Sequence, residues 1–257
     1  MLIISLTVLP ERCNNNFIKV LESLRTQPNI PEHLISVYVQ MDELPKILLD
    51  YEKEHKGEVE FTLIDSKYRS YSKFYYASKK YNKECDIVTA DDDLIYLPRL
   101  YINYNYYLTW TNKQSIVGAC CLNVPIVNRE IIGPYKHNPN SKFLPTEYSY
   151  GVRSLSGCFM IIPKGFFEEK DFDDIDEFSQ SAVGTSDEDY LWYKGIIKDK
   201  PQYSSGLYSR GFKDIYSNYF TYSYSLWNNY NRKKEQHLNQ IKFLNSKISN
   251  YFNKLKN

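Results

Sequence analysis

The sequence has no long hydrophobic run and no excess of one charge. No segment reaches about 18 uninterrupted apolar residues, the length that a membrane-spanning helix requires, so we expect no such helix. The segment Met1–Pro10 is too short to span a bilayer and lacks the basic start of a secretory signal. The formal net charge is +1 with 25% charged residues, which gives no reason to expect nucleic acid as a partner.

Metal-ligand spacing is also missing among the five cysteines. Four of them lie in or beside apolar strand-like runs, where a free thiol behaves as a small hydrophobic side chain. A reducing compartment fits this pattern best, which predicts a cytoplasmic protein.

Charge is distributed unevenly along the chain. Residues 226–257 carry seven Lys or Arg and one Glu, a local charge of +6, which leaves −5 for the remainder. We therefore expect a globular body over residues 1–215 and a separate aromatic and basic helical tail over residues 216–257.

The tail has an apolar stripe on a lysine-rich helix, with its members three or four residues apart: Leu238, Ile241, Leu244, Ile248, Phe252 and Leu255. The preceding segment Tyr216–Tyr230 places aromatic residues around Trp227. Such a helix could lie in the interface of an anionic bilayer, which would place the protein on the inner face of the cell membrane. It could instead pair with another helix or pack on the body. All three alternatives stay open at this point.

Strand and helix patterns alternate through the first half of the chain. Apolar runs predict strands at Ile3–Leu9, Leu34–Gln40, Val59–Ile64 and Asp86–Asp91. Helical spacing lies between them, at Phe17–Leu24, Pro45–His55 and Ser70–Tyr81. This alternation predicts an α/β fold with a mostly parallel sheet flanked by helices, with ligands at the carboxyl ends of the strands.

The second half has weaker signals. Pro98 suits the first turn of a helix through Trp110, and strands are expected at Ser115–Cys121 and Leu155–Ile162. The segment Gly133–Tyr150 is rich in Pro, Asn, Tyr and Gly, and a loop of this length is more typical of a substrate-covering segment than of a simple connection.

An acidic triplet, Asp91-Asp92-Asp93, ends the Asp86–Asp91 strand and is followed by the apolar pair Leu94-Ile95. In an extended chain Asp91 and Asp93 point to one face and Asp92 to the other. Two carboxylates on one side of a strand end repel each other unless a cation lies between them, and Mg²⁺ or Mn²⁺ prefers such ligands. The alternative is a solvated acidic turn.

A second acidic group, Asp187-Glu188-Asp189, follows Ser186 and lies in the first turn of a helical pattern that runs from Leu191 and Trp192 through Ile196 and Ile197. Ser186 as N-cap with an acidic first turn would explain these residues structurally. A carboxylate beside an apolar wall such as Trp192 could equally have its pKa raised enough to act as a base.

Together these motifs resemble the GT-A fold nucleotide-sugar glycosyltransferases, in particular bacterial inverting family 2-like enzymes of capsule and lipopolysaccharide assembly. The resemblance covers residues 1–200. It rests on an ordered set of segments: Ile3–Thr7, Tyr71–Ala77, Asp91–Asp93, Ser156–Phe159 and Glu188–Trp192.

The resemblance implies a role for each matching residue. Thr7 and Asp42 would contact the nucleotide base and ribose, and Lys73 would lie near the donor diphosphate, unless it is a plain surface lysine. In the triplet, Asp91 would approach the ribose or the cation, Asp92 would belong to the donor site, and Asp93 would bind Mn²⁺ or Mg²⁺.

For the acceptor side, the resemblance implies that Asp189 is the base that deprotonates the acceptor hydroxyl, with Glu188 beside it. The donor expected is a UDP-sugar and the acceptor a saccharide or lipid-linked saccharide. The Gly-rich stretch common in relatives is reduced here to Gly157, and His137 is the one histidine with any prospect of a site role.

Other classes remain. A retaining GT-A glycosyltransferase would use the acidic pair to position the donor. A catalytically silent sugar-nucleotide or partner-binding module would use the acids as caps and surface. A nucleotidyltransferase is disfavoured because Leu9–Arg12 contains no glycine for a phosphate loop.

Overall fold

A seven-stranded sheet forms the centre of the computed structural model, which describes residues 1–65, 67–119, 121–124, 126–127, 130–132, 152–154, 158–181, 186–205 and 234–254. The strand order is β11-β5-β10-β4-β1-β2-β3. β1, β2, β3 and β4 are parallel neighbours, whereas β10 is antiparallel to both β4 and β5. Because β11 is parallel to β5, all strands except β10 run in one direction. The predicted mostly parallel sheet is confirmed.

The strands have these bounds: β1 Leu2–Val8, β2 His33–Val39, β3 Val59–Leu63, β4 Asp86–Ala90, β5 Val117–Gly118, β10 Cys158–Ile162 and β11 Tyr203–Ser204. Two short antiparallel pairs stand outside this sheet, β6 Cys121–Asn123 with β9 Val152–Ser154 and β7 Ile126–Val127 with β8 Glu130–Ile131. The helices are α1 Asn15–Arg25, α2 Lys46–Glu54, α3 Ser72–Tyr81, α4 Leu100–Trp110, α5 Ile175–Gln180, α6 Asp187–Ile197 and α9 Lys234–Lys254.

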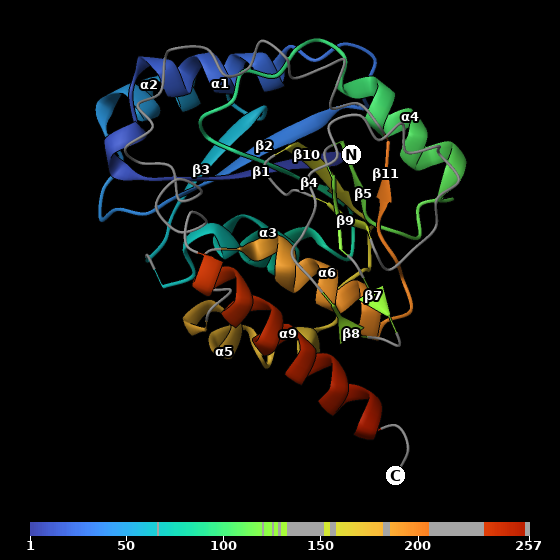
Figure 1. Ribbon diagram of the computed structural model, residues 1–257. Helices are drawn as coiled ribbons and strands as arrows, with labels where there is room; N and C mark the ends of the chain where they lie inside the picture. Colours follow the sequence, from blue (N-terminus) through green and yellow to red (C-terminus); the bar gives the residue numbers. More distant parts are fainter. Residues whose placement is uncertain are drawn as a thin grey trace.

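Helices cover both faces of the sheet, with α1, α2 and α4 on one side and α3, α5, α6 and α9 on the other (Figure 1). Alternation along β1 separates two apolar cores, since Leu6 packs toward α1 and α2 while Ile3 packs toward α3. Phe17 from α1 and Phe74 from α3 fill the two cores from opposite sides. Burial on both faces explains why β1, β2 and β4 are predominantly apolar.

Several predicted boundaries need correction. The strand predicted at Ser115–Cys121 is two strands, β5 and β6, which belong to different sheets. The helix expected from Pro98 begins at Leu100, and the helix expected from Ser70 is a short 3₁₀ turn, Arg69–Tyr71, followed by α3. The long loop at Gly133–Tyr150, His137, Gly157 and the aromatic segment Tyr216–Tyr230 lie outside the described residues.

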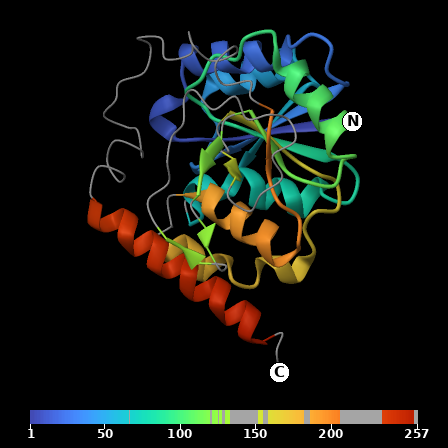
Figure 2. The ribbon, with the colours of Figure 1, turned by 45° about the vertical axis from the view of Figure 1, so that its right-hand side comes forward.

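The C-terminal helix α9 lies against the body, beside α6 and β8 (Figure 2), where Ile241, Leu244 and Ile248 of its apolar stripe are buried. Leu244 is fully buried and Ile248 nearly so, in the same core as α3, α5 and α6. Asn245 makes two backbone hydrogen bonds to Ile131 of β8, and the Tyr251 hydroxyl donates to the Ile197 carbonyl of α6. Of the three alternatives for this helix, residues 234–254 adopt packing on the body, since Ile241, Leu244 and Ile248 are buried in its core.

None of the helices in the described part of the chain combines the length and apolar character needed to cross a bilayer.

Candidate functional site

The candidate site lies where β1, β2 and β4 end. These strands are parallel neighbours in the order β4-β1-β2, so their carboxyl ends meet at one edge of the sheet. The chain proceeds from β1 to one side and returns to the other side with β4, which makes this edge a topological switch point. Cys158, the first residue of the antiparallel β10, pairs with Ala90 at the same edge. Both halves of the chain therefore reach the site.

Two residues expected at the nucleotide lie on this edge. Thr7, near the end of β1, has a buried Oγ1 without a hydrogen-bond partner among the described residues. Asp42 is exposed in the bend after β2. A buried orphan hydroxyl costs free energy, so the position of Thr7 suits contact with a ligand.

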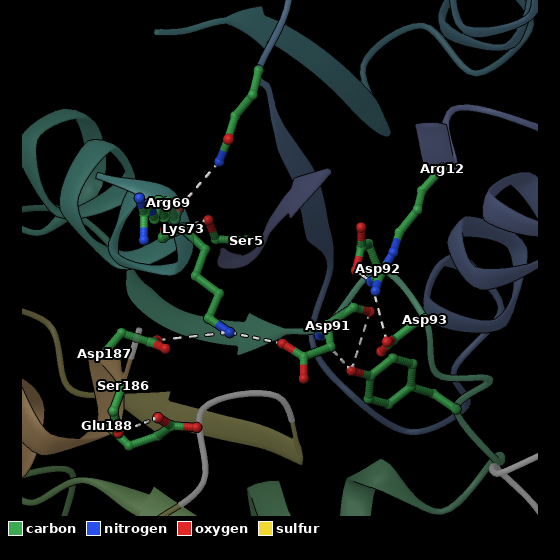
Figure 3. Close-up of polar contacts among 12 residues, drawn as sticks. Ser5, Arg12, Arg69, Lys73, Asp91, Asp92, Asp93, Ser186, Asp187 and Glu188 are labelled. Carbon is green, nitrogen blue, oxygen red and sulfur yellow. Dashed lines mark hydrogen bonds and ion pairs between the residues drawn. The ribbon is translucent and has the colours of Figure 1, made fainter. Parts of the chain in front are cut away.

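Lys73 is the central cation of the site. Its ammonium nitrogen lies 2.7 Å from Oδ1 of Asp91 and 3.6 Å from Oδ2 of Asp187 (Figure 3). Ser5 of β1 donates a 2.5 Å hydrogen bond to the Lys73 carbonyl and holds the start of α3 against the sheet. Burial acts to lower the pKa of Lys73, but the charges of Asp187 and Asp91 raise it above its ordinary value. The alternative of a plain surface lysine is wrong.

Arg12 is the second cation, from the short 3₁₀ turn Pro10–Arg12 directly after β1. Its Nη1 lies 2.5 Å from Asp92 and 3.1 Å from Asp93 (Figure 3). β4 ends at Ala90, so the triplet is not extended and Asp92 does not point away from Asp93. The alternating geometry predicted for the triplet is therefore wrong, since a turn brings two neighbouring carboxylates to one guanidinium.

The triplet holds more negative charge than its cations balance. Burial raises the pKa of Asp92 to about 7, Arg12 acts in the opposite direction, and the charges of Asp93 and Asp91 add to the rise. Burial and the charge of Asp91 also raise the pKa of Asp93. If Asp187 and all three aspartates of the triplet are ionised, their four negative charges exceed the two positive charges of Lys73 and Arg12 by two. Burial and this excess together are why the pKa of Asp92 and of Asp93 is raised.

Tyr96 fixes the backbone of the triplet. Its hydroxyl accepts a 2.7 Å hydrogen bond from the Asp91 amide, and Tyr96 itself is buried. On the other side, the Tyr96 amide donates to Ser23 Oγ and its carbonyl accepts from Gln27 Nε2, both on or beside α1. The hydrogen bonds of Tyr96 thus connect the start of the acidic turn to α1.

The first turn of α6 supplies the second acidic group. Ser186 occupies the N-cap position but makes no capping hydrogen bond, so the capping alternative fails for its side chain. Instead Arg153 of β9 donates to Ser186 Oγ at 2.6 Å and to Oδ1 of Asp189 at 2.5 Å. Ser186 donates to Oε2 of Glu188 at 3.1 Å. Sequence reasoning did not identify Arg153 as a site residue.

Among the described residues, no group of three or more His, Cys, Asp or Glu side chains could by itself hold a metal ion. Asp91 and Asp93 nevertheless offer hard carboxylate oxygens in a cluster where carboxylates outnumber the cations Lys73 and Arg12. Mg²⁺ is commonly held by one or two carboxylates and completes its shell with water and substrate phosphates. The residues present therefore fit a cation that is shared with a phosphate-bearing ligand.

Solved structures with the same architecture include S. aureus TarS. The structure of TarS 1–349 matches with a TM-score of 0.55 at 15% identity, over 79% of this chain and 58% of that one. The same fragment in complex with UDP gives 0.54 at 13% identity, over 79% and 57%. Its complex with UDP-GlcNAc gives 0.50 at 15% identity, over 79% and 56%.

No family model matches the chain, and no curated protein matches it. At these identities the likeness shows the fold alone, and the chain spans a little over half of the TarS fragment. The chain has an α/β GT-A fold with a C-terminal helix, as predicted.

Proposed function

We propose that the protein is a metal-dependent glycosyltransferase that moves a sugar from a nucleoside-diphosphate donor to a saccharide or lipid-linked saccharide acceptor, with inversion. The observation that carries this proposal is the position of Lys73 between Asp91, after β4, and Asp187, at the start of α6. One buried cation joins the two acidic motifs, so the donor and acceptor chemistry would meet at a single place.

The donor would lie along the edge formed by β1, β2 and β4. Thr7 and Asp42 would contact the base and ribose, and the likeness to a TarS structure with UDP makes a UDP-sugar the first donor to test. Lys73 would contribute its charge to the diphosphate, since its raised pKa keeps the ammonium protonated. Asp92 would keep Arg12 in place through their ion pair. It would thereby contribute to the donor site indirectly, by stabilising the acidic turn after β4.

A Mn²⁺ or Mg²⁺ ion would be held by Asp91 and Asp93. Such an ion supplies Lewis-acid stabilisation of the negative charge that develops on the leaving diphosphate. Its two positive charges would match the two that remain uncompensated among Asp91, Asp92, Asp93 and Asp187, and would lower the raised pKa of Asp92 and of Asp93.

The acceptor hydroxyl would be activated by a carboxylate in the first turn of α6, where Glu188 and Asp189 lie. A base on the side opposite the leaving group allows in-line attack at the anomeric carbon, and hence inversion.

Synthesis of a bacterial surface polysaccharide would be the setting, in the cytoplasm or on the inner face of the membrane. Because Ile241, Leu244 and Ile248 of the stripe are buried, membrane attachment through residues 226–257 would depend mainly on basic side chains such as the exposed Lys242. Cosedimentation with vesicles containing anionic lipid, against neutral vesicles, tests this part separately.

The first experiment is calorimetric titration of UDP, GDP, CDP and CMP with Mn²⁺, repeated with chelator and with Asp93→Ala. We expect metal-dependent binding of UDP that the variant loses. Exposed Asp50→Asn is the matched control and should bind as the wild type does. Absence of binding to every nucleotide in every condition would refute the proposal.

A further inference from the structure

The three carboxylates in the first turn of α6 have different environments. The side chain of Asp189 is 0% exposed, that of Asp187 is 3% exposed, and that of Glu188 is 20% exposed. A base must reach a hydroxyl of an incoming substrate, so access alone favours Glu188. Asp187 is also committed to the ammonium of Lys73 on the donor side.

Asp189 is held by Arg153. The Nε of Arg153 lies 2.5 Å from Oδ1 of Asp189, and both side chains are almost completely buried. A buried carboxylate bonded to a guanidinium is a strong orienting group, because breaking the pair would leave an uncompensated charge in the interior. Asp189 therefore fixes the plane of the Arg153 fork.

The other arm of that fork sets the direction of the Ser186 hydroxyl. Nη2 of Arg153 has only protons to give, so Ser186 Oγ accepts at 2.6 Å. The single proton of Ser186 is then available for Oε2 of Glu188 at 3.1 Å. The same Nη2 lies 3.7 Å from Oε2. Asp189, Arg153, Ser186 and Glu188 thus form one ordered chain of hydrogen bonds that ends at the accessible carboxylate.

We propose that Glu188 is the catalytic base, and that Asp189, Arg153 and Ser186 are positioning residues that aim it; this inference rests on the proposed function. In the step, an oxygen lone pair of the acceptor hydroxyl forms the new bond to the anomeric carbon. The bond from that carbon to the diphosphate oxygen breaks, and its electron pair leaves with the nucleoside diphosphate. The hydroxyl proton passes to the Oε1 side of the Glu188 carboxylate, which later returns it to solvent.

The test compares Glu188→Gln, Asp189→Asn, Ser186→Ala and Arg153→Lys, with exposed Glu84→Gln as the matched control. Each variant is assayed for hydrolysis of UDP-sugars with Mn²⁺, in which water replaces the acceptor, and for UDP binding and thermal unfolding. Arg153→Lys keeps the charge but not the fork, so it tests positioning even if Asp189→Asn fails to fold.

We expect Glu188→Gln to lower kcat about 100-fold or more while UDP binding and the unfolding temperature stay unchanged. Asp189→Asn should lower the unfolding temperature and keep more of kcat than Glu188→Gln. Ser186→Ala should move the acidic limb of the kcat/KM profile to higher pH, because a lost hydrogen bond to the ionised form raises the pKa of a carboxylate.

Two results would overturn the assignment. Full activity in Glu188→Gln, or a folded Asp189→Asn that binds UDP but loses more kcat than Glu188→Gln, would return the base to Asp189. An unmoved pH profile in Ser186→Ala would remove the positioning chain. A wild-type protein that binds no nucleotide and hydrolyses no donor would instead refute the transferase proposal itself, and the assignment with it.

Discussion

The ammonium group of Lys73 lies 2.7 Å from Oδ1 of Asp91, which joins the first turn of α3 to the residue that follows β4. Lys73 could not occupy this place alone without cost, because its side chain is 6% exposed and an unpaired charge there would be poorly solvated. The ion pair therefore connects α3 to the end of β4, and its ammonium group can also bind a phosphate.

Replacing Lys73 by Met should destabilise the protein and abolish UDP binding. The variant removes the ammonium group that lies beside the buried carboxylate of Asp187, for which we expect a loss of about 3 kcal/mol or more in the free energy of unfolding. Urea denaturation and calorimetry measure the two effects. Lys80→Met removes a half-exposed lysine that pairs with Glu60 and should change UDP binding little; equal effects of both variants would contradict a special role for Lys73.

Tyr96→Phe should weaken metal-dependent UDP binding without unfolding the protein. The substitution removes the hydroxyl that accepts from the Asp91 amide, a hydrogen bond whose net contribution to stability is about 1 kcal/mol. The control is Tyr104→Phe, which changes a buried tyrosine on α4. UDP titration with and without Mn²⁺ measures the effect, and identical affinities for both variants would show that this anchor does not shape the site.

Leu244→Ala should destabilise the protein by about 2–5 kcal/mol, because it leaves a cavity between α9 and the body. Leu238→Ala lies on the same helix but its side chain is 47% exposed, so it should have little effect. Thermal unfolding distinguishes them. Equal and small changes would mean that α9 contributes nothing to the fold.

Glu22→Gln should lower the free energy of unfolding at neutral pH. On acidification the variant should lose less of this free energy than the wild type does. The hydrogen bond from Arg25 is the main reason that the pKa of Glu22 is lowered, with a further one from Tyr51. A lowered folded-state pKa stabilises above the unfolded value of about 4.3, and this contribution disappears as pH falls through the folded value.

Since the Glu22 side chain is 37% exposed, we expect a difference of about 1 kcal/mol or less at pH 7. Urea denaturation at neutral and acidic pH measures it, with Glu54→Gln on the exposed face of α2 as the control. A difference that grows in acid would have the wrong sign for this explanation.

The first half of the fold was predictable because its signals are local. β1, β2, β3 and β4 are apolar runs bounded by turns, and the helices between them have one apolar face each. Lys73 and the acidic triplet could be identified because each belongs to a recognisable segment. The short strands β6 to β9 could not, since two or three residues have no period to detect.

The partners of the acids were missed for a different reason. Arg12 contacts Asp92 across 80 positions of sequence and Arg153 contacts Asp189 across 36. Neither arginine lies in a motif, and only the topology brings them to the site. A basic residue directly after β1, at the same sheet edge as three aspartates, was the one available signal for Arg12.

The place of β10 between β4 and β5 sets an order of assembly during synthesis. β1 to β4 are contiguous in the sheet and can pair once residue 90 has emerged from the ribosome. β5 is made next but has no neighbour in this sheet until β10 arrives, and β11, which is made last, then pairs with the other edge of β5. Because such distant pairings form slowly, β5 would spend this interval as an unprotected edge. The donor half of the site would thus take shape well before the half that carries the base.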